Sequence, residues 1–178
     1  MEHPRRDQPI RLREARHGEE LAVAELHVRS WQEAYRGLMP DEFLDRLDPR
    51  DRASRYTFGT GGDEGPTTML AVVGEERIAG FVTFGASRDE DARGLGEVYA
   101  LYVDPDRHRS GVGRLLMAEA RRRLGERGFA AAVLWVLRGN TRAASFYESE
   151  NWRPDGATRV EQPYGIISTV DRFRRPLD

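Results

Sequence analysis

The stretch GEVYALYVDPDRHRSGVGR, residues 96–114, decides the fold, because a strand signal, a glycine-containing turn and a helix start follow one another in it without a break. Val98–Val103 is rich in β-branched and aromatic residues, which predicts a strand. Pro105 ends the strand, since proline donates no ladder hydrogen bond and restricts the residue before it. The basic turn Arg107–Gly113 then leads directly into a predicted helix.

A strand, a glycine loop and a helix N-terminus in this order form a site for anions. Unpaired main-chain N–H groups and the positive end of the helix dipole converge there, and glycine lets a phosphate approach the main chain. Two other phosphate motifs are excluded, because Tyr99 stands where the pattern starting at Gly94 needs its third glycine, and no GxxxxGK[ST] occurs. The spacing therefore predicts a phosphate-bearing ligand at residues 107–114.

The composition indicates a globular protein that forms one domain over residues 1–178, with a frayed lead-in at 1–8 and a tail at 174–178. Its 178 residues are 39% hydrophobic and 33% charged, which is enough to build a core. The net charge of −2 argues against a nucleic-acid binder. All 28 basic residues are arginine.

The same composition limits the possible chemistry. There is no cysteine, which excludes disulfides, thiolate metal sites and a cysteine nucleophile. The four histidines are scattered, so no metal site is expected. No apolar run is long enough to cross a bilayer and the N-terminal residues lack an apolar signal core, so we expect a cytoplasmic protein without a membrane partner.

Hydrophobic periodicity predicts an α/β protein whose sheet mixes strand directions, because strands alternate with helices in the second half of the chain. Residues 59–66 are expected to form a glycine-rich loop, and Pro154–Gly156 a turn. The expected strands are 10–16, 67–73, 78–84, 98–103, 129–137, one starting at 152, and 165–173; the expected helices are 18–35, 40–47, 48–56, 114–128 and 140–150.

Two motifs resemble the GCN5-related N-acetyltransferase (GNAT) family. HRSGVG, residues 108–113, resembles that family's acyl-CoA pyrophosphate loop, Gln/Arg-x-x-Gly-x-Gly/Ala. NTRAASFYE, residues 140–148, resembles its Asn-x-x-Ala-x-x-Phe-Tyr-Glu helix. Residues 27–37 are similar to the acceptor-side helices of bacterial members. The resemblance covers roughly residues 10–177.

The resemblance implies a single-domain GNAT fold: a mixed, mostly antiparallel twisted sheet of six to seven strands, splayed at its centre between residues 97–103 and 130–137 and flanked by helices. It implies acetyl-CoA as the cofactor. Leu101 and Val103 would pair by main chain with the pantetheine arm, and Asn140 would orient that arm while capping its helix. The pyrophosphate loop would be His108, Arg109, Ser110, Gly111, Val112, Gly113 and Arg114, with His108 replacing the usual Gln or Arg.

The implied reaction is direct transfer of an acetyl group from acetyl-CoA to a primary amine in a ternary complex. Tyr147 would protonate the leaving thiolate, or else only pack its ring on the sheet. Glu97, eleven residues before His108, would be the general base or an ordinary strand-end glutamate. Trp31 and Tyr35 would line the acceptor pocket or belong to the core.

The alternative from another class of protein is a non-catalytic acyl-CoA-binding module that has kept the loop and lost turnover. For an enzyme the acceptor stays open between a small-molecule amine and an amine of a protein or peptide. Many family members dimerise, so a homodimer is expected, although no residue pattern defines its interface.

Overall fold

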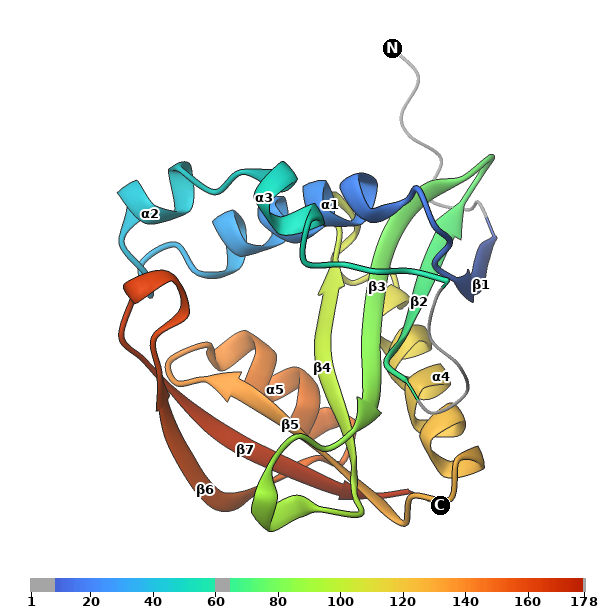
Figure 1. Cartoon of the computed structure of the whole chain (residues 1–178), viewed down its shortest axis with the longest axis vertical. Helices are drawn as coiled ribbons and strands as arrows, with labels where there is room; N and C mark the ends of the chain where they lie inside the picture. The colour runs from blue at the N-terminus through green and yellow to red at the C-terminus, as the bar shows by residue number, and fades with distance from the viewer. Residues whose placement is uncertain (1–8, 60–64, 178) are drawn as a thin grey trace.

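A computed structural model gives the fold and describes residues 9–59 and 65–177. The lead-in expected at residues 1–8, most of the glycine-rich loop and the last residue of the tail therefore lie outside the described residues. A seven-stranded sheet runs through the molecule in the order β1-β2-β3-β4-β5-β7-β6 (Figure 1). Neighbouring strands are antiparallel except β4 and β5, which are parallel.

The bounds of the elements follow the expected order of strands and helices. The strands are β1 (Ile10–Glu14), β2 (Thr67–Val73), β3 (Arg77–Ala86), β4 (Gly96–Val103), β5 (Ala131–Leu137), β6 (Arg153–Glu161) and β7 (Ser168–Pro176). The α-helices are α1 (Glu20–Ala34), α2 (Asp41–Asp45), α3 (Pro49–Ala53), α4 (Val112–Glu126) and α5 (Thr141–Ser149), and short 3-10 turns are η1 (Glu90–Ala92), η2 (Pro105–Arg107) and η3 (Pro163–Gly165).

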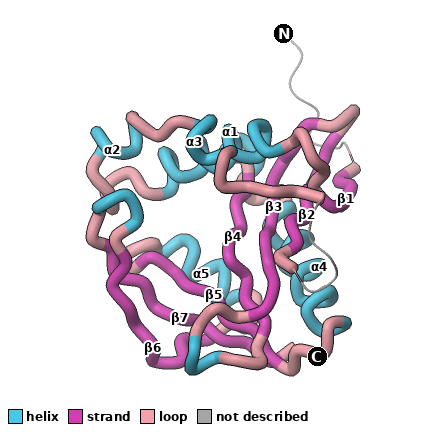
Figure 2. The backbone as a smooth tube through the Cα atoms, viewed as in Figure 1, coloured by secondary structure: helices cyan, strands magenta, loops and turns pink. Residues whose placement is uncertain are grey.

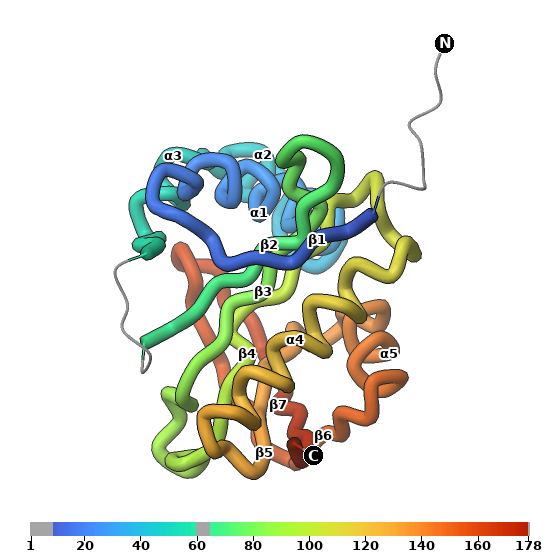
Figure 3. Tube along the Cα trace, turned by 90° about the vertical axis from the view of Figure 1, so that its right-hand side faces the viewer, coloured from blue at the N-terminus to red at the C-terminus, as the bar shows by residue number. Residues whose placement is uncertain are grey.

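The two faces of the first half-sheet bury two different sets of side chains. Because side chains alternate along a strand, Met69 and Ala71 of β2 join one core cluster, and Leu70 and Val72 join the other. The first cluster includes the buried stripe of α4, and the second includes α1. Figures 2 and 3 show α1–α3 gathered at one end of the molecule, with α4 running along the sheet away from them.

The centre of the sheet is splayed, as expected. β4 and β5 pair only between Gly96–Val98 and Ala132–Leu134, and their remaining residues do not pair with each other. The register of β3 against β4 shifts next to this point, which leaves Tyr99 as an extra residue in β4. Such a bulge bends and twists its strand, and β4 accordingly turns away from β5 beyond Val98.

Two expectations for the C-terminal strands are wrong. Pro154–Gly156 does not reverse the chain but lies inside β6, where the pairing with β7 is irregular between Pro154 and Thr158. β6 is an edge strand, and an edge strand tolerates proline because one side of it needs no ladder partner. The expected tail at 174–178 is also β-structure as far as Pro176, which is opposite Ala131 of β5.

Candidate active site

The loop before α4 presents main-chain donors that no protein group uses. Gly111 is the N-cap of α4 with φ of 83°, a left-handed conformation that glycine adopts without strain, and no side chain caps this helix. The first hydrogen bond of the helix runs from the Leu115 N–H to the Gly111 carbonyl at 3.0 Å. Within the described chain the N–H groups of residues 112–114, which precede it, have no acceptor. They are free to bind an anion.

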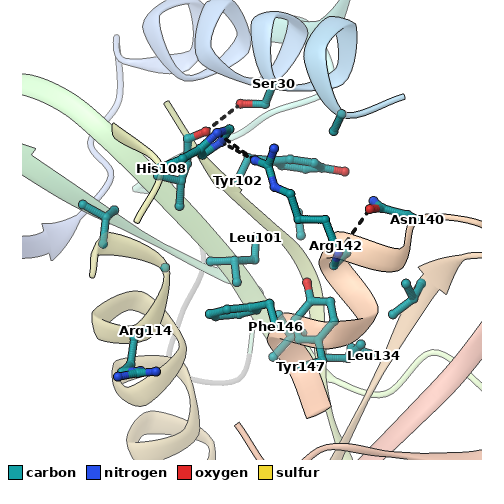
Figure 4. A pocket seen from close by; sticks show the side chains of 18 of the residues that line it. Ser30, Leu101, Tyr102, His108, Arg114, Leu134, Asn140, Arg142, Phe146 and Tyr147 are labelled. Atoms are coloured by element: carbon teal, nitrogen blue, oxygen red, sulfur yellow. Dashed lines mark hydrogen bonds between the residues drawn. The ribbon is translucent and has the colours of Figure 1, made fainter. Parts of the chain in front are cut away.

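A cavity of about 630 Å³ opens at this loop, between β4, β5, α5 and the C-terminal end of α1. All ten residues predicted to bind the cofactor line it, and so do Tyr35 and Tyr147. Figure 4 shows Leu101, His108, Arg114, Asn140 and Tyr147 around it. A pocket of this size, open at a helix N-terminus and along a strand, suits an elongated phosphate-bearing ligand.

The wall formed by β4 offers main-chain groups as well. The Asp104 N–H donates to the Ala79 carbonyl of β3 at 2.8 Å. Because successive residues direct their main-chain groups to opposite edges of a strand, those of Leu101 and Val103 face the edge that β5 leaves open. Ser30 of α1 donates to the Val103 carbonyl at 3.2 Å, so this wall is anchored to the helix behind it. The open edge can pair with an amide-containing arm.

Asn140 is placed both to cap α5 and to face the cavity, as its two expected roles require. Its Oδ1 accepts a hydrogen bond from the Ala143 N–H at 3.1 Å and caps α5, while the residue also lines the cavity. The cap fixes the first turn of α5 and thereby the direction of the residues one and two turns further on.

Tyr147 packs with its ring and leaves its hydroxyl free. The ring contacts Phe146, Trp152 and Phe173 of the core cluster. The hydroxyl has no hydrogen-bond partner in the part of the chain that the structure describes, and Figure 4 shows it pointing into the cavity. Burial, and secondarily the nearby Tyr102, raises the pKa of this phenol, so it stays protonated at neutral pH. At neutral pH the phenol therefore carries a proton that it can donate.

Glu97 is not brought into the cavity. It is 1% exposed and lies in the short segment where β4 still pairs with β5. Its carboxylate accepts from the Arg88 N–H at 2.9 Å and from the Arg88 guanidinium at 2.8 Å. A buried carboxylate is thus paired with the exposed side chain of Arg88, and the pair fixes the loop after β3. The geometry therefore offers less for the base role of Glu97 than for the acid role of Tyr147.

The aromatic side chains at the end of α1 are divided between two cavities. Tyr35 lines the first, where its hydroxyl is 3.4 Å from that of Tyr102. Burial raises the pKa of both phenols. Trp31 lies one turn earlier, contacts Tyr35 edge-on and lines a second cavity instead.

His108, which stands where the family motif has Gln or Arg, contacts the side chain of Arg142. The sequence motifs did not single out Arg142. The Arg142 guanidinium of α5 lies 2.8 Å from its Nδ1 and 2.7 Å from its Nε2, and also 3.1 Å from the carboxylate of Glu33. Burial and the charge of Arg142 lower the pKa of His108, which keeps it neutral. Arg142 occupies a variable position of its motif, so no sequence signal distinguished it.

The described residues contain no group of three or more His, Asp or Glu side chains placed to hold a metal ion. In residues 9–59 and 65–177, none of the helices combines the length and the apolar character that a bilayer crossing requires.

Known proteins match this chain in sequence and in fold. The Acetyltransferase (GNAT) family matches residues 21–151. The uncharacterized N-acetyltransferase YuaI of Bacillus subtilis is 28% identical over 142 residues, 79% of this chain and 78% of that protein. An uncharacterized N-acetyltransferase of Archaeoglobus fulgidus is 30% identical over 71% of this chain and 84% of its own length. The structure of yncA from Salmonella typhimurium with its cofactor acetyl-CoA is 18% identical, with a TM-score of 0.69 over 95% of this chain and 94% of that one.

The splayed sheet, the uncapped loop and these matches together define the class of protein. The chain belongs to the acetyltransferase (GNAT) family. It is an acetyl-CoA-dependent N-acetyltransferase, and the free main-chain donors at residues 112–114 and along β4 fit a ligand with a pyrophosphate and an amide-rich arm.

Proposed function

We propose that this protein binds acetyl-CoA and an acceptor with a primary amine at the same time, and that the amine attacks the acetyl group directly. The observation that carries the proposal is one continuous cavity in which the uncapped start of α4, the open edge of β4 and the free hydroxyl of Tyr147 meet. Bound acetyl-CoA supplies the acetyl group and a thiolate leaving group.

In this proposal the protein contributes mainly position and one proton. Residues 109–114 would hold the pyrophosphate, mainly through the free N–H groups of residues 112–114, with Arg142 adding a positive charge from the opposite side. The open edge of β4 would fix the arm at Leu101 and Val103, and orientation of two bound reactants supplies much of the rate in such reactions. The Tyr147 hydroxyl would donate its proton to the leaving sulfur.

The acceptor amine must also lose a proton during the reaction. Glu97 would have to leave Arg88 to act as base. The phenols of Tyr35 and Tyr102 cannot take this role near neutral pH, because burial keeps them protonated. An amine that enters uncharged, or one that loses its proton to water, needs no dedicated carboxylate.

Membership of the family does not define which amine is the acceptor, how the chains assemble or where in the cell the protein lies. We propose a small-molecule or protein amine as acceptor, and a homodimer in the cytoplasm, because these are common in the family that the motifs resemble. Size-exclusion chromatography with light scattering tests the dimer.

The test of the function is a thiol-release assay with acetyl-CoA and a panel of amines, run beside calorimetric titration of coenzyme A. Release that depends on one class of amine, with the acetylated amine identified by mass spectrometry, is the expected result. Tight coenzyme A binding without release on any amine contradicts the proposal and favours a non-catalytic acyl-CoA-binding module.

A further inference from the structure

A second cavity of about 230 Å³ lies against α1, between α2, α3 and the turn that joins β6 to β7. Its apolar walls include Phe43 and the ring of Tyr164. Trp31, His27 and Arg52 also line it.

His27 carries an N–H donor that has no partner. The residue is 2% exposed. Its Nδ1 is 3.2 Å from the Nε of Arg52 and also contacts the Tyr56 hydroxyl. A guanidinium can only donate and a hydroxyl can donate as well, so Nδ1 is the acceptor. Burial and Arg52 hold the pKa of His27 well below its usual range, so the ring is neutral and its one proton is on Nε2. Within the described chain Nε2 has no hydrogen-bond partner.

Trp31 has the same property one turn further along α1. Its Nε1, which can only donate, is buried, and no group among residues 9–59 and 65–177 accepts from it with full hydrogen-bond geometry. It lies near enough to the Tyr102 hydroxyl to offset part of the rise in pKa that burial causes in that phenol. Buried polar groups are nearly always satisfied, so two unsatisfied donors on one side of one helix call for a missing acceptor.

Arg52 adds a positive charge to the second cavity. Its guanidinium lies 6.0 Å from the ring centre of Trp31 and donates to the Tyr164 hydroxyl at 3.2 Å. No carboxylate of the described chain lies within ion-pair distance of it, although Arg46 and many other arginines of this protein have such partners. Asp48 and Asp51 line the cavity too, but they are exposed at its rim, and Asp48 caps α3 through the Arg50 N–H.

The part of this cavity around Arg52 therefore offers N–H donors and one cation that has no carboxylate partner in the described chain. We propose that the second cavity binds a carboxylate group carried by the acceptor, so that the substrates are amines with a carboxylate at their far end. A carboxylate matches the fork of a guanidinium. The proposal rests on the proposed function, since it names the acceptor class of the same reaction.

The two cavities share a wall of aromatic rings, which gives the acceptor a direction. His27 of the second cavity stacks on Tyr102 of the first with 4.4 Å between ring centres, and Trp31 meets Tyr35 at 5.1 Å. An acceptor whose carboxylate reaches Arg52 would extend past this layer toward the Tyr35 and Tyr102 hydroxyls, where its amine can meet the acetyl group. The small volume beside Arg52 favours a terminal carboxylate over a bulky anion.

Matched acceptors and a matched variant test this. Thiol release is measured with pairs of amines that differ only in a carboxylate or a carboxamide at the far end. We expect a KM at least tenfold lower for the carboxylate member, and Arg52→Gln should abolish that preference while leaving the KM for acetyl-CoA unchanged. The control is Arg55→Gln, which removes an equal charge from the other side of Tyr164, where the guanidinium lies 4.8 Å from the ring centre and lines no part of the cavity.

A binding measurement separates failure of this inference from failure of the proposed function. Tryptophan fluorescence, to which Trp31 contributes beside Trp135 and Trp152, is titrated with a carboxylate that has no amine, and in parallel with inorganic phosphate. Quenching by the carboxylate that Arg52→Gln removes and Arg52→Lys partly restores supports the site even if no amine is turned over. Quenching by phosphate alone overturns it. Turnover with equal KM for both members of every pair overturns it while the proposed function stands.

Discussion

The Glu97 carboxylate is held by one residue at both of its oxygens, because Arg88 donates its main-chain N–H to Oε2 and its guanidinium to Oε1. Arg88 also lies over the Tyr99 ring, 4.1 Å from its centre. Glu97 thus ties the loop after β3 to the bulge of β4. A substitution at Glu97 should therefore affect the stability of the fold.

Glu97→Gln should lower stability and leave the pH dependence of turnover alone. The amide keeps an acceptor for one of the two hydrogen bonds but loses the charge, and a poorly satisfied buried polar group costs about 1–3 kcal/mol. That corresponds to a Tm lower by roughly 2–4 °C for each kcal/mol in a chain of this length. Thermal unfolding and a pH–rate profile are measured together. Loss of the acidic limb of the profile with an unchanged Tm would instead identify Glu97 as the base.

Tyr147→Phe should cut turnover at least tenfold, which is about 1.4 kcal/mol of transition-state stabilisation. The change removes the hydroxyl and keeps the ring that packs on Trp152 and Phe173. Coenzyme A affinity, measured by calorimetry on the same preparation, should be nearly unchanged. A variant as fast as the parent rules out Tyr147 as the acid.

Arg142→Gln should raise the KM for acetyl-CoA roughly tenfold with a small change in kcat, because a hydrogen bond to a charged group contributes about 1.5–3 kcal/mol and this one is partly exposed to solvent. The steady-state KM for acetyl-CoA is the measurement. Arg122→Gln is the control, since Arg122 pairs with Glu119 and Glu126 on the exposed side of α4. Equal effects of the two changes would point to general charge and not to a contact at the loop.

The free energy of unfolding should fall as the pH rises above about 10, the usual pKa of tyrosine. Burial raises the folded-state pKa of Tyr35, Tyr102 and Tyr147. A phenol whose pKa is raised in the folded state stabilises the protein fully at a pH below its unfolded-state pKa. That stabilisation is lost progressively as the pH rises from the unfolded-state pKa to the higher folded-state pKa. The chain has no lysine and no cysteine to titrate in the same range.

Urea unfolding at several alkaline pH values, followed beside the ultraviolet absorbance of tyrosinate, measures this loss. Tyr102→Phe should make the decline shallower. A free energy of unfolding that is independent of pH across the tyrosine range would show that these phenols ionise equally in both states.

The features that the sequence predicted well have local causes. Pro105 ends β4, Gly111 adopts the left-handed conformation that its loop needs, and Asn140 caps α5 through a residue three places on. Each depends on a few neighbouring residues, so their order along the chain is enough. The misplaced turn at Pro154–Gly156 fails for the opposite reason, because pairing with β7 decided whether the chain reversed there or bulged.

The face of β4 to which the Glu97 side chain points could not be predicted from its separation from His108 along the chain. Strict alternation along β4 would place Glu97 on the same face as Leu101 and Val103. The extra residue at Tyr99 shifts this alternation, so that Val98 joins those two in the core cluster on the α4 side. One bulge therefore changes the surroundings of a proposed catalytic group while its distance to His108 along the chain stays the same.

The polar groups of both cavities depend on contacts across long stretches of chain. His108 meets Arg142 from 34 residues away, and Arg52 meets His27 from 25 and Tyr164 from 112. Arginine is so frequent in this sequence that no single one stood out. Only the folded chain distinguishes an arginine with a carboxylate partner from one without.

The short pairing between β4 and β5 has a mechanical consequence. Three residue pairs join two half-sheets that are each well paired internally, so the seam is where the sheet should open first under thermal or chemical stress. A ligand whose amide groups lie between β4 and β5 adds main-chain hydrogen bonds where the two strands do not pair. At a hundred times its Kd such a ligand stabilises the fold by about 2.7 kcal/mol. Amide exchange in β4 and β5 should therefore slow together when the cofactor binds.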